Sequence, residues 1–158
     1  PPRRKDNTRY VAENQSPLPA VGGSVPFPFY ASDGAAAMDL CACVDAPVEV
    51  PPGAMVTIPT GIAIALPSPD YMALVFARSG LATRHGLALS NGVGVIDSDY
   101  RGELSVGLVN LSARAYTIRA GDRIAQLAVV PVARAVIVPA DRLDETSRGA
   151  GGFGSTGR

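Results

Sequence analysis

The sequence contains no tryptophan, two cysteines, one histidine and one lysine among its 158 residues. Cys41 and Cys43 are too few and too close together for a disulfide framework, and with His85 they do not supply a structural zinc site. We therefore expect reduced thiols in an intracellular protein, most simply in the cytoplasm. A short basic run, Pro1–Lys5, leaves nuclear targeting as an alternative.

Excess charge of either sign is also missing, because 14 basic residues balance 14 acidic ones. A neutral chain sets up no global field that would attract nucleic acid or a membrane surface. No apolar run approaches the roughly 20 residues that span a bilayer. Aromatic residues are too few for the stacking platforms of single-strand-binding barrels. We expect neither a nucleic-acid nor a membrane partner, so an anionic ligand would be bound by local arginines, which contact phosphate bidentately.

Length and patterning predict one all-β domain with a substantial core. Short apolar runs are separated by proline and glycine at intervals of roughly 8–12 residues, which is typical of a sandwich or barrel. The helix expected is short, near Ser79–His85, and Val25–Tyr30 could form an edge strand. The other expected strands are Val48–Val50, Ala54–Ile58, Gly61–Leu66, Tyr71–Ala77, Glu103–Leu111, Tyr116–Ile118, Arg123–Val130 and Ala135–Val138.

The two ends of the chain differ in composition from the middle. Residues 1–24 are polar and aperiodic, which predicts a flexible arm before a β-rich domain at 25–140. Within the C-terminal segment 141–158, the stretch Ser147–Gly157 holds five glycines and cannot form part of a packed core. This stretch is either a disordered tail or a phosphate clamp with an aromatic lid, and composition alone leaves both open.

The most informative stretch is Asn91–Gly102, in which glycines allow a tight turn before two carboxylates. Asp97 and Asp99 are two residues apart, so an extended chain projects both to one face. Carboxylates in that position can bind a metal, act as a general base or be solvated in a turn. The residues alone do not choose among these roles.

Three other segments place polar groups at strand ends. Ala77–Gly80 offers a guanidinium, a hydroxyl and flexible amides, a set that suits phosphate. Asp39 stands in an apolar stretch and needs a partner if it is buried. In Gly121–Gln126, a regular strand would place Arg123 opposite Ile124 and Gln126 on the same face as Ile124.

Taken together and in order, five segments resemble the five motifs of the trimeric dUTPases, deoxyuridine triphosphate diphosphatases. They are Ala35–Leu40, Ala77–Leu81, Asn91–Gly102, Gly121–Leu127 and Arg148–Gly157. The resemblance runs from about Phe27 to Gly157. Ala37 and Met38 in the first segment and Ala77 in the second depart from the usual pattern, which affects local geometry rather than a reacting group.

The resemblance implies a distorted jelly-roll or β-barrel-like fold that assembles as a homotrimer with sites between subunits. The implied reaction is Mg²⁺-assisted hydrolysis of dUTP to dUMP and pyrophosphate by attack of water at the α-phosphorus. This reaction limits uracil incorporation into DNA and supplies dUMP for thymidylate synthesis. The segment 141–158 would then close as a glycine-rich lid over a neighbouring subunit's site.

The resemblance also assigns roles to individual residues. Asp97 is the implied general base, and Asp39 reaches the metal through water. Asp99 is expected to be structural, with Arg101 at the turn, and His85 to be a surface or interface residue. The third segment would form a β-hairpin, and base and sugar contacts fall to Asn91, Gly94, Val95, Ile96, Tyr100 and Phe153. Phosphate contacts fall to Arg78, Ser79, Gly80, Gln126, Arg148, Gly154, Ser155 and Thr156.

Two alternatives remain, a second enzyme of the same fold and a protein of a different functional class. A dCTP deaminase of the same fold would release ammonia, although the third and fifth segments follow the dUTPase form. A non-catalytic trimer would use the same pocket as a nucleotide-operated switch for a protein partner. The intact Asp97 argues against loss of catalysis without excluding a second role.

Overall fold

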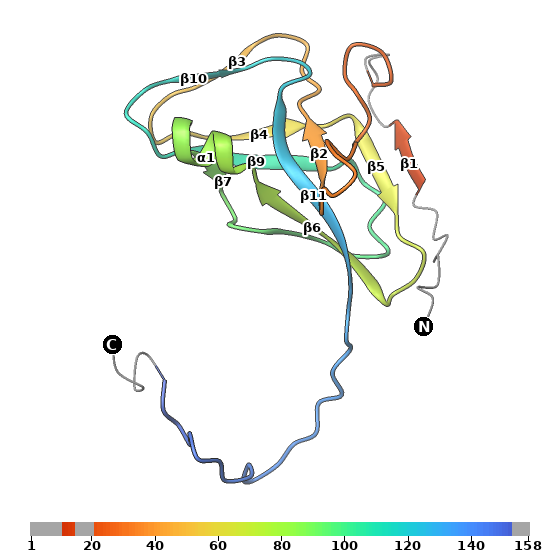
Figure 1. Ribbon diagram of the computed structural model, residues 1–158, viewed down its shortest axis with the longest axis vertical. Coiled ribbons are helices and arrows are strands. Elements are labelled where there is room, and N and C mark those ends of the chain that lie inside the picture. Colours follow the sequence, from red (N-terminus) through yellow and green to blue (C-terminus); the bar gives the residue numbers. More distant parts are fainter. Residues whose placement is uncertain (1–10, 15–20, 153–158) are drawn as a thin grey trace.

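The computed structural model describes residues 11–14 and 21–152 (Figure 1). Strands dominate this part of the chain, which confirms the all-β prediction. They are β1 (Val11–Asn14), β2 (Met38–Cys41), β3 (Val48–Val50), β4 (Met55–Pro59), β5 (Ile62–Ala65), β6 (Tyr71–Ala77), β7 (Leu87–Leu89), β8 (Gly94–Ile96), β9 (Ser105–Asn110), β10 (Tyr116–Ile118) and β11 (Arg123–Pro131). The expected helix is α1, Ser79–His85.

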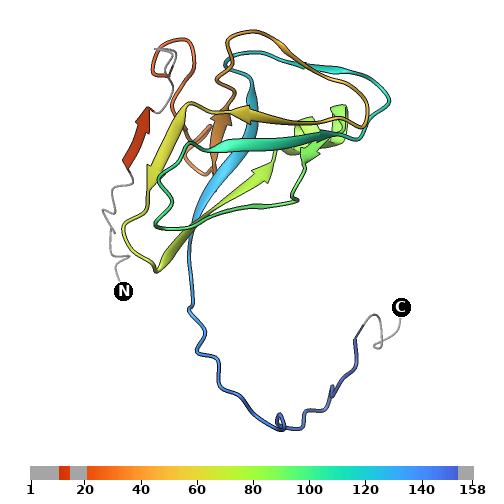
Figure 2. The same cartoon turned by 180° about the vertical axis from the view of Figure 1, so that it is seen from behind.

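Two larger sheets and two strand pairs make up the body. One sheet has the order β2-β11-β6-β8 and the other β4-β9-β7, while β1 pairs with β5 and β10 with β3. All of these pairings are antiparallel. The sheets lie in two layers, because β11 passes in front of β9 in Figure 1 and behind it in the reverse view of Figure 2.

The core lies between these layers and follows from alternation along the strands. In β9, Val106, Leu108 and Asn110 are buried while the residues between them are more exposed. Leu108 from one sheet and Leu127 from the other are each 1% exposed. Burying such a side chain contributes about 1.5–3 kcal/mol, so this interior fixes the strands that present the polar groups described below.

Two expectations about the N-terminal part were wrong. The strand β1 pairs with β5 along its whole length, so Val11–Asn14 are not a loose arm. Residues 1–10 and 15–20 lie outside the described part of the chain. Val25–Tyr30 form no strand, and their ladder contacts are two isolated bridges, Val21 with Val25 and Phe29 with Asp39. The prolines at 26 and 28 lack the N–H that a continuous ladder requires.

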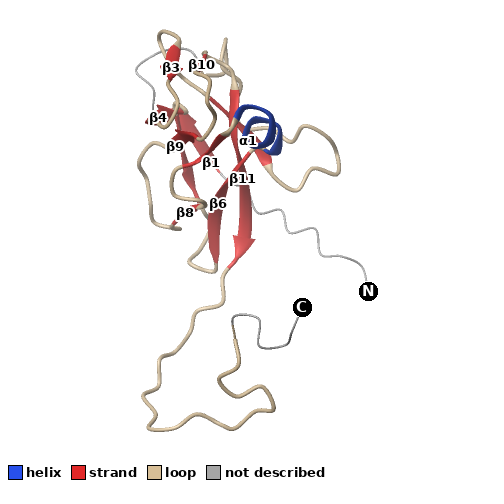
Figure 3. Cartoon of the chain, turned by 90° about the vertical axis from the view of Figure 1, so that its left-hand side faces the viewer, coloured by secondary structure: helices blue, strands red, loops and turns tan. Residues whose placement is uncertain are grey.

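The expected strand at Ala135–Val138 was also wrong. After β11 the chain leaves the body as an extended segment without strand or helix up to residue 152 (Figure 3). Val136, Ile137 and Val138 are 86%, 85% and 76% exposed. Their apolar pattern is that of a strand, but no edge in the described part of the same chain lies beside them. This segment is called the tail below, for residues 132–152.

Gly61 offers a sharp test of the packing between β4 and β5. Its φ is +73°, and an added Cβ would lie 2.6 Å from Val21 Cγ2 and 2.9 Å from Cys43 Sγ. Gly61→Ala is therefore expected to lower the free energy of unfolding by about 2 kcal/mol or more, through backbone strain plus overpacking. Urea unfolding followed by far-ultraviolet circular dichroism measures this loss.

The matched control is Gly53→Ala. Gly53 has nearly the same φ, +75°, but a Cβ added there would meet nothing within 4 Å. This variant is expected to lose only the backbone component, about 1–2 kcal/mol. Equal losses in both variants would show that the close contact at Gly61 contributes nothing.

Candidate functional site

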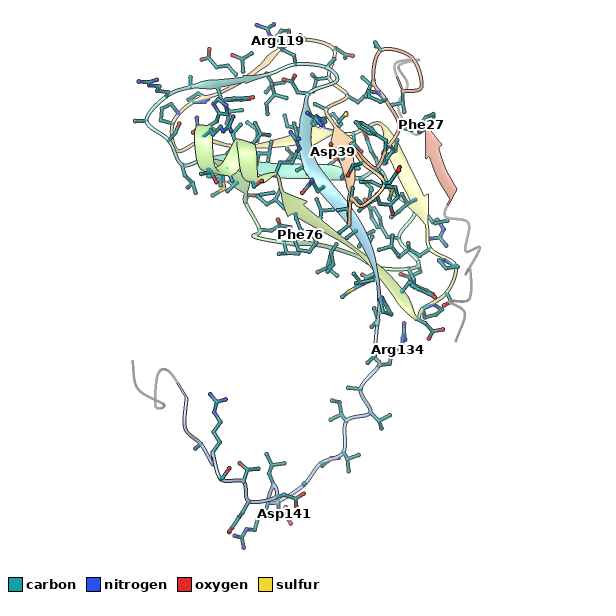
Figure 4. All side chains as sticks on the ribbon, viewed as in Figure 1. Phe27, Asp39, Phe76, Arg119, Arg134 and Asp141 are labelled. Carbon is teal, nitrogen blue, oxygen red and sulfur yellow. The ribbon has the colours of Figure 1, made fainter. Side chains whose placement is uncertain are left out.

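A buried carboxylate joins three strands at one end of the four-stranded sheet. Asp39, on β2, is 2% exposed (Figure 4). Its Oδ1 accepts a hydrogen bond from Arg78 Nε at 3.0 Å, and its Oδ2 accepts one from Arg123 Nη1 at 3.1 Å. Burying an unpaired carboxylate costs several kcal/mol, so these two ion pairs allow Asp39 to remain inside. The expectation that Asp39 has a partner is confirmed.

The register of the sheet explains why these groups meet. Gln126 on β11 lies opposite Asp39 on β2 and opposite Phe76 on β6, so the three form one row across the sheet. Arg78 follows β6 directly and is the N-cap residue of α1. Its Nη1 also donates to the backbone carbonyl of Arg123 at 3.2 Å.

Strand β11 is not regular here, contrary to the expectation for Gly121–Gln126. Arg123 pairs with Cys41 and Ala125 with Leu40, so the register shifts between Arg123 and Ala125. A bulge inserts one residue and changes the face to which the preceding side chain points. Arg123 consequently points to Asp39, and the sequence prediction missed this residue. The pairing depends on the bulge, which residue types alone did not reveal.

This group, Asp39, Arg78 and Arg123, is called the arginine cluster below. Two guanidinium groups and one carboxylate leave it with an excess positive charge. Ser79 and Gly80 are exposed beside it at the start of α1. The structure thus brings five of the predicted residues together, namely Asp39, Arg78, Ser79, Gly80 and Gln126. An excess of N–H donors with exposed backbone amides suits a polyphosphate.

The thiol of Cys41 lies beside the arginine cluster. Burial raises the pKa of Cys41, and the neighbouring Asp39 carboxylate raises this pKa further, while Arg123 and Arg78 act in the opposite direction. A raised pKa keeps the group as a neutral thiol near pH 7, and only a thiolate is a strong nucleophile. Cys41 therefore packs as a small apolar side chain and is not a candidate nucleophile.

A second group of predicted residues surrounds a cavity of about 280 Å³ beside β8. Asp97 follows β8 and is exposed at the cavity, with Tyr100 on the turn that comes next. The backbone N–H of Tyr100 donates to the Asp97 carbonyl at 3.2 Å, and the Tyr100 hydroxyl donates to the Glu103 carbonyl at 3.1 Å. The other lining residues are Val95, Ile96, Glu103, Leu104 and Ser105.

Gly102 allows this position of the tyrosine ring. A Cβ on Gly102 would lie 2.6 Å from Tyr100 Cζ, which is too close for any side chain without movement of the ring. The glycine therefore holds a place for Tyr100 against the cavity wall. Glycine is required at position 102 because the Tyr100 ring lies so close to it, not because the backbone there has a positive φ.

The prediction for Asp99 was incomplete. Arg101 Nη1 donates to the carbonyls of Ser98 and Tyr100, both at 2.8 Å, and these carbonyls rather than the Asp99 carboxylate are its partners in the described part of the chain. Asp99 instead borders a separate cavity of about 420 Å³, which also reaches Asp97, Met72 and Arg134. The arginine thus caps the turn through backbone carbonyls.

Asn91 lies on the turn between β7 and β8, with Gly92 at a φ of +75°. The expected hairpin was wrong, because β7 pairs with β9 while β8 pairs with β6, so this turn connects the two sheets. Asn91 is exposed, and an added Cβ on Gly94 would lie 3.8 Å from its Nδ2. The turn thus presents an amide side chain beside the strand that leads to Asp97.

The arginine cluster and the Asp97 cavity lie at opposite ends of β6. Ala73 pairs with Ile96, so Asp97 lies level with Met72, whereas Arg78 comes six residues further along the extended chain. At about 3.3 Å per residue this separation is about 20 Å. The structure thus brings the predicted residues together as two groups rather than as one.

Residues predicted for the lid are only partly described. Arg148 lies on the tail, where its Nε donates to the Gly151 carbonyl at 2.9 Å within the same turn. Phe153, Gly154, Ser155 and Thr156 lie outside the described residues. Asp141, labelled in Figure 4, shows that the tail is displaced from the body.

Neither His85 nor a group of metal-ligating side chains forms a catalytic centre in the described part of the chain. His85 is exposed and packs against Tyr116 with ring centroids 5.0 Å apart, consistent with a surface residue. Among the residues that the structure describes, no three His, Cys, Asp or Glu side chains gather closely enough to hold a metal.

In the same residues no helix is long and apolar enough to cross a membrane.

Similarity to known proteins covers nearly the whole chain. A family model described as dUTPase matches residues 24–157. The deoxyuridine 5'-triphosphate nucleotidohydrolase of Desulfitobacterium hafniense strain DSM 10664 / DCB-2 is 51% identical over 148 residues, which cover 94% of this chain and 93% of that protein. The protein of the same name from Idiomarina loihiensis is 51% identical over 138 residues, 87% of this chain and 91% of its own length.

Solved structures share the fold at lower identity. A mutant of the dUTPase of Staphylococcus bacteriophage 80alpha, solved with dUpNHpp, has a TM-score of 0.81 and 22% identity, covering 95% of this chain and 99% of its own. A mutant dUTPase of phage phi11 of S. aureus, described with a structural Mg(II) ion, has a TM-score of 0.74 and 20% identity, covering 87% and 99%.

Proposed function

This chain belongs to the dUTPase family, and on that basis we propose that it hydrolyses dUTP to dUMP and pyrophosphate at sites shared between subunits. The observation that carries the proposal is the pair of groups beside the two ends of β6. Asp97, an exposed carboxylate next to a cavity, lies level with one end, and the arginine cluster lies at the other. These are the parts of a phosphoryl hydrolysis site, a proton acceptor and a polyphosphate cradle.

The separation of the two groups argues for assembly. A proton acceptor must lie within hydrogen-bond reach of the attacking water, so a gap of about 20 Å within one chain is too long. A second copy that places its Asp97 near the first copy's arginine cluster removes the gap. Closed symmetry then gives equivalent sites at every interface, which fits a homotrimer with three sites.

The tail supports the same assembly. Val136, Ile137, Val138 and Leu143 are between 76% and 90% exposed. Such a run of apolar side chains gains stability only when another surface covers it. We expect a neighbouring subunit to provide that surface and to bring residues 141–158, the proposed lid, toward a neighbour's site.

In the proposed complex, the arginine cluster and the start of α1 bind the triphosphate. Arg78, Ser79 and Gly80 supply charge-assisted and backbone donors, and Gln126 adds a side-chain amide from the same row as Asp39. Donors fixed by packing stabilise the charge that develops as the reaction proceeds. From the lid, Arg148, Gly154, Ser155 and Thr156 would complete the enclosure and exclude bulk water.

The chemical step requires one proton acceptor. Asp97 accepts a proton from water as the water oxygen forms a bond to the α-phosphorus. The bond from the α-phosphorus to the oxygen bridging to the β-phosphorus breaks, and pyrophosphate leaves with that electron pair. The products are dUMP and pyrophosphate. Hydrolysis would limit uracil incorporation into DNA and supply dUMP for thymidylate synthesis.

The cavity next to Asp97 is the proposed place for uracil and deoxyribose. Asn91 and the backbone of Gly94, Val95 and Ile96 would pair with the uracil edge, and Tyr100 would lie against the sugar and exclude a 2′-hydroxyl. A site built to hydrogen-bond its substrate discriminates strongly, because an analogue leaves buried groups unpaired. Phe153, from the lid, would cover the base.

Magnesium fits as an ion held mainly by the nucleotide. Both oxygens of Asp39 already accept a hydrogen bond from an arginine, and its side chain is 3% exposed. Each carboxylate oxygen has a second lone pair, which is compatible with contact through a metal-bound water but not with a protein cage. When bound, Mg²⁺ would neutralise part of the phosphate charge.

A nucleotide panel tests the proposed activity. Pyrophosphate release is measured with dUTP, dTTP, UTP and dCTP, each with and without Mg²⁺, together with ammonia release from dCTP. We expect dUTP to be preferred by about a hundredfold or more over each of the others, because a methyl group, a 2′-hydroxyl or a changed base edge disturbs the cavity. Ammonia from dCTP would instead identify a deaminase. Nucleotide binding without any turnover would favour the switch protein.

Asp97→Asn tests the assigned base. The variant keeps the size of the side chain but accepts no proton, so pyrophosphate release is expected to fall by about 10²–10⁴-fold while binding of a non-hydrolysable dUTP analogue survives. Asp99→Asn is the matched control, because it removes an exposed carboxylate two residues away on the same turn. Normal turnover by Asp97→Asn would exclude this carboxylate as the base.

A further inference from the structure

The side chain of Arg123 is 47% exposed, but it forms an ion pair with Asp39, whose side chain is only 3% exposed. An ion pair of an exposed arginine contributes little stability, because fixing the long side chain costs entropy and solvent screens the charge. This pair matters instead for Arg78, which shares the Asp39 carboxylate with Arg123. The position of Arg123 depends on the bulge in β11, so it is a local departure from regular strand geometry.

Arg78 and Arg123 share Asp39 by dividing its two oxygens. Arg78 uses its Nε on Oδ1, and Arg123 uses its Nη1 on Oδ2. An arginine free to do so pairs both carboxylate oxygens with two of its own N–H groups in a bidentate fork. Arg78 instead makes a single contact with Asp39, through its inner nitrogen, because the Arg123 guanidinium already lies at Oδ2 and like charge disfavours a second guanidinium N–H at the same oxygen.

The backbone of Arg123 completes this restraint. Its carbonyl accepts a hydrogen bond from Arg78 Nη1 at 3.2 Å. The guanidinium of Arg78 is therefore held by two contacts, from Asp39 and from the main chain of β11. The side chain of Arg78 is 23% exposed, and its second terminal nitrogen, Nη2, takes part in neither of these contacts with the described residues. That nitrogen remains available to an anion.

We infer that Arg123 is a positioning residue for the phosphate site, which acts through Asp39 to keep the outer N–H groups of Arg78 available to a triphosphate. This inference rests on the proposed hydrolysis of dUTP. Without the Arg123 side chain, Arg78 rotates into a bidentate pair with Asp39. The polyphosphate then loses both a pre-oriented donor and part of the positive charge.

The first experiment compares Arg123→Gln with the unaltered protein. We expect the KM for dUTP to rise about tenfold and kcat to change less than about threefold, because the lost interaction concerns phosphate binding. Affinity for inorganic triphosphate, measured by calorimetry, is expected to fall by a similar factor. Affinity for deoxyuridine, which carries no phosphate, should stay unchanged. An unchanged KM and triphosphate affinity would overturn the inference.

Arg119→Gln is the matched control. Arg119 precedes Arg123 by four residues and lies at the top edge of the body in Figure 4, opposite the tail. It is exposed, and its guanidinium forms no ion pair among the described residues. This variant removes the same charge from the same region of the chain. A KM that rises equally in both variants would indicate a general loss of positive field and would also overturn the inference.

The second experiment distinguishes positioning from direct contact with phosphate. In an Arg78→Gln background, a residue that acts only through Arg78 has nothing left to position, so adding Arg123→Gln should raise the KM by less than about twofold. A further rise of about tenfold would show that Arg123 contacts the phosphates itself. That outcome rejects the positioning role.

Folding and function are separated by two further measurements. If Arg123→Gln does not give a folded protein by circular dichroism, Arg123→Lys is measured instead. It keeps the charge, but its ammonium ends one atom closer to the backbone than the Nη1 that reaches Oδ2, so the KM should rise about threefold. A wild-type-like KM in Arg123→Lys would then overturn the inference. If the unaltered protein releases no pyrophosphate from dUTP, the proposed function fails, whereas triphosphate affinity still tests the positioning role.

Discussion

The length of strand β6 sets the distance between Asp97 and the arginine cluster within one chain. Asp97 and the arginine cluster are fixed at its two ends by sheet pairing, and an extended strand cannot shorten. A side-chain rearrangement does not close a gap of about 20 Å. If Asp97 and the arginine cluster act on one substrate, as proposed, one chain holds two incomplete halves of the site, and assembly is a chemical requirement for catalysis.

In the arginine cluster, the proposed phosphate half of the site, a buried carboxylate connects core packing to ligand binding. Asp39 is buried because β2 lies against β11, and its charge is stabilised by the arginines that border the site. Such a carboxylate orders the guanidinium groups before any ligand arrives, which lowers the entropy cost of binding an anion. The bulge in β11 is part of the same arrangement, since it directs Arg123 to the remaining oxygen.

The sequence predicted the elements whose signals are local and missed those that depend on pairing. Strands β3, β6 and β10 were predicted with the bounds observed, because apolar alternation and flanking turn residues mark them. Ala135–Val138 carry the same signal but lack a partner edge in the described part of the chain. Arg123 was missed because a bulge has no compositional mark here, and the separation of Asp97 from Arg78 depends on which strand pairs with β8. The residue types at the site were therefore predictable, whereas their grouping required the sheet register.

The most direct test of the shared site is complementation between two defective chains. At dUTP concentrations well below the wild-type KM, Asp97→Asn and Arg78→Gln are each expected to release little pyrophosphate alone, because one lacks the base and the other binds dUTP weakly. When both are co-expressed, some sites receive an intact Asp97 from one chain and an intact Arg78 from another. Random mixing predicts pyrophosphate release from dUTP at about a quarter of the wild-type rate. Activity that stays at the level of the separate variants, in mixed assemblies verified by mass spectrometry, would show that each site takes both residues from one chain and would contradict the account.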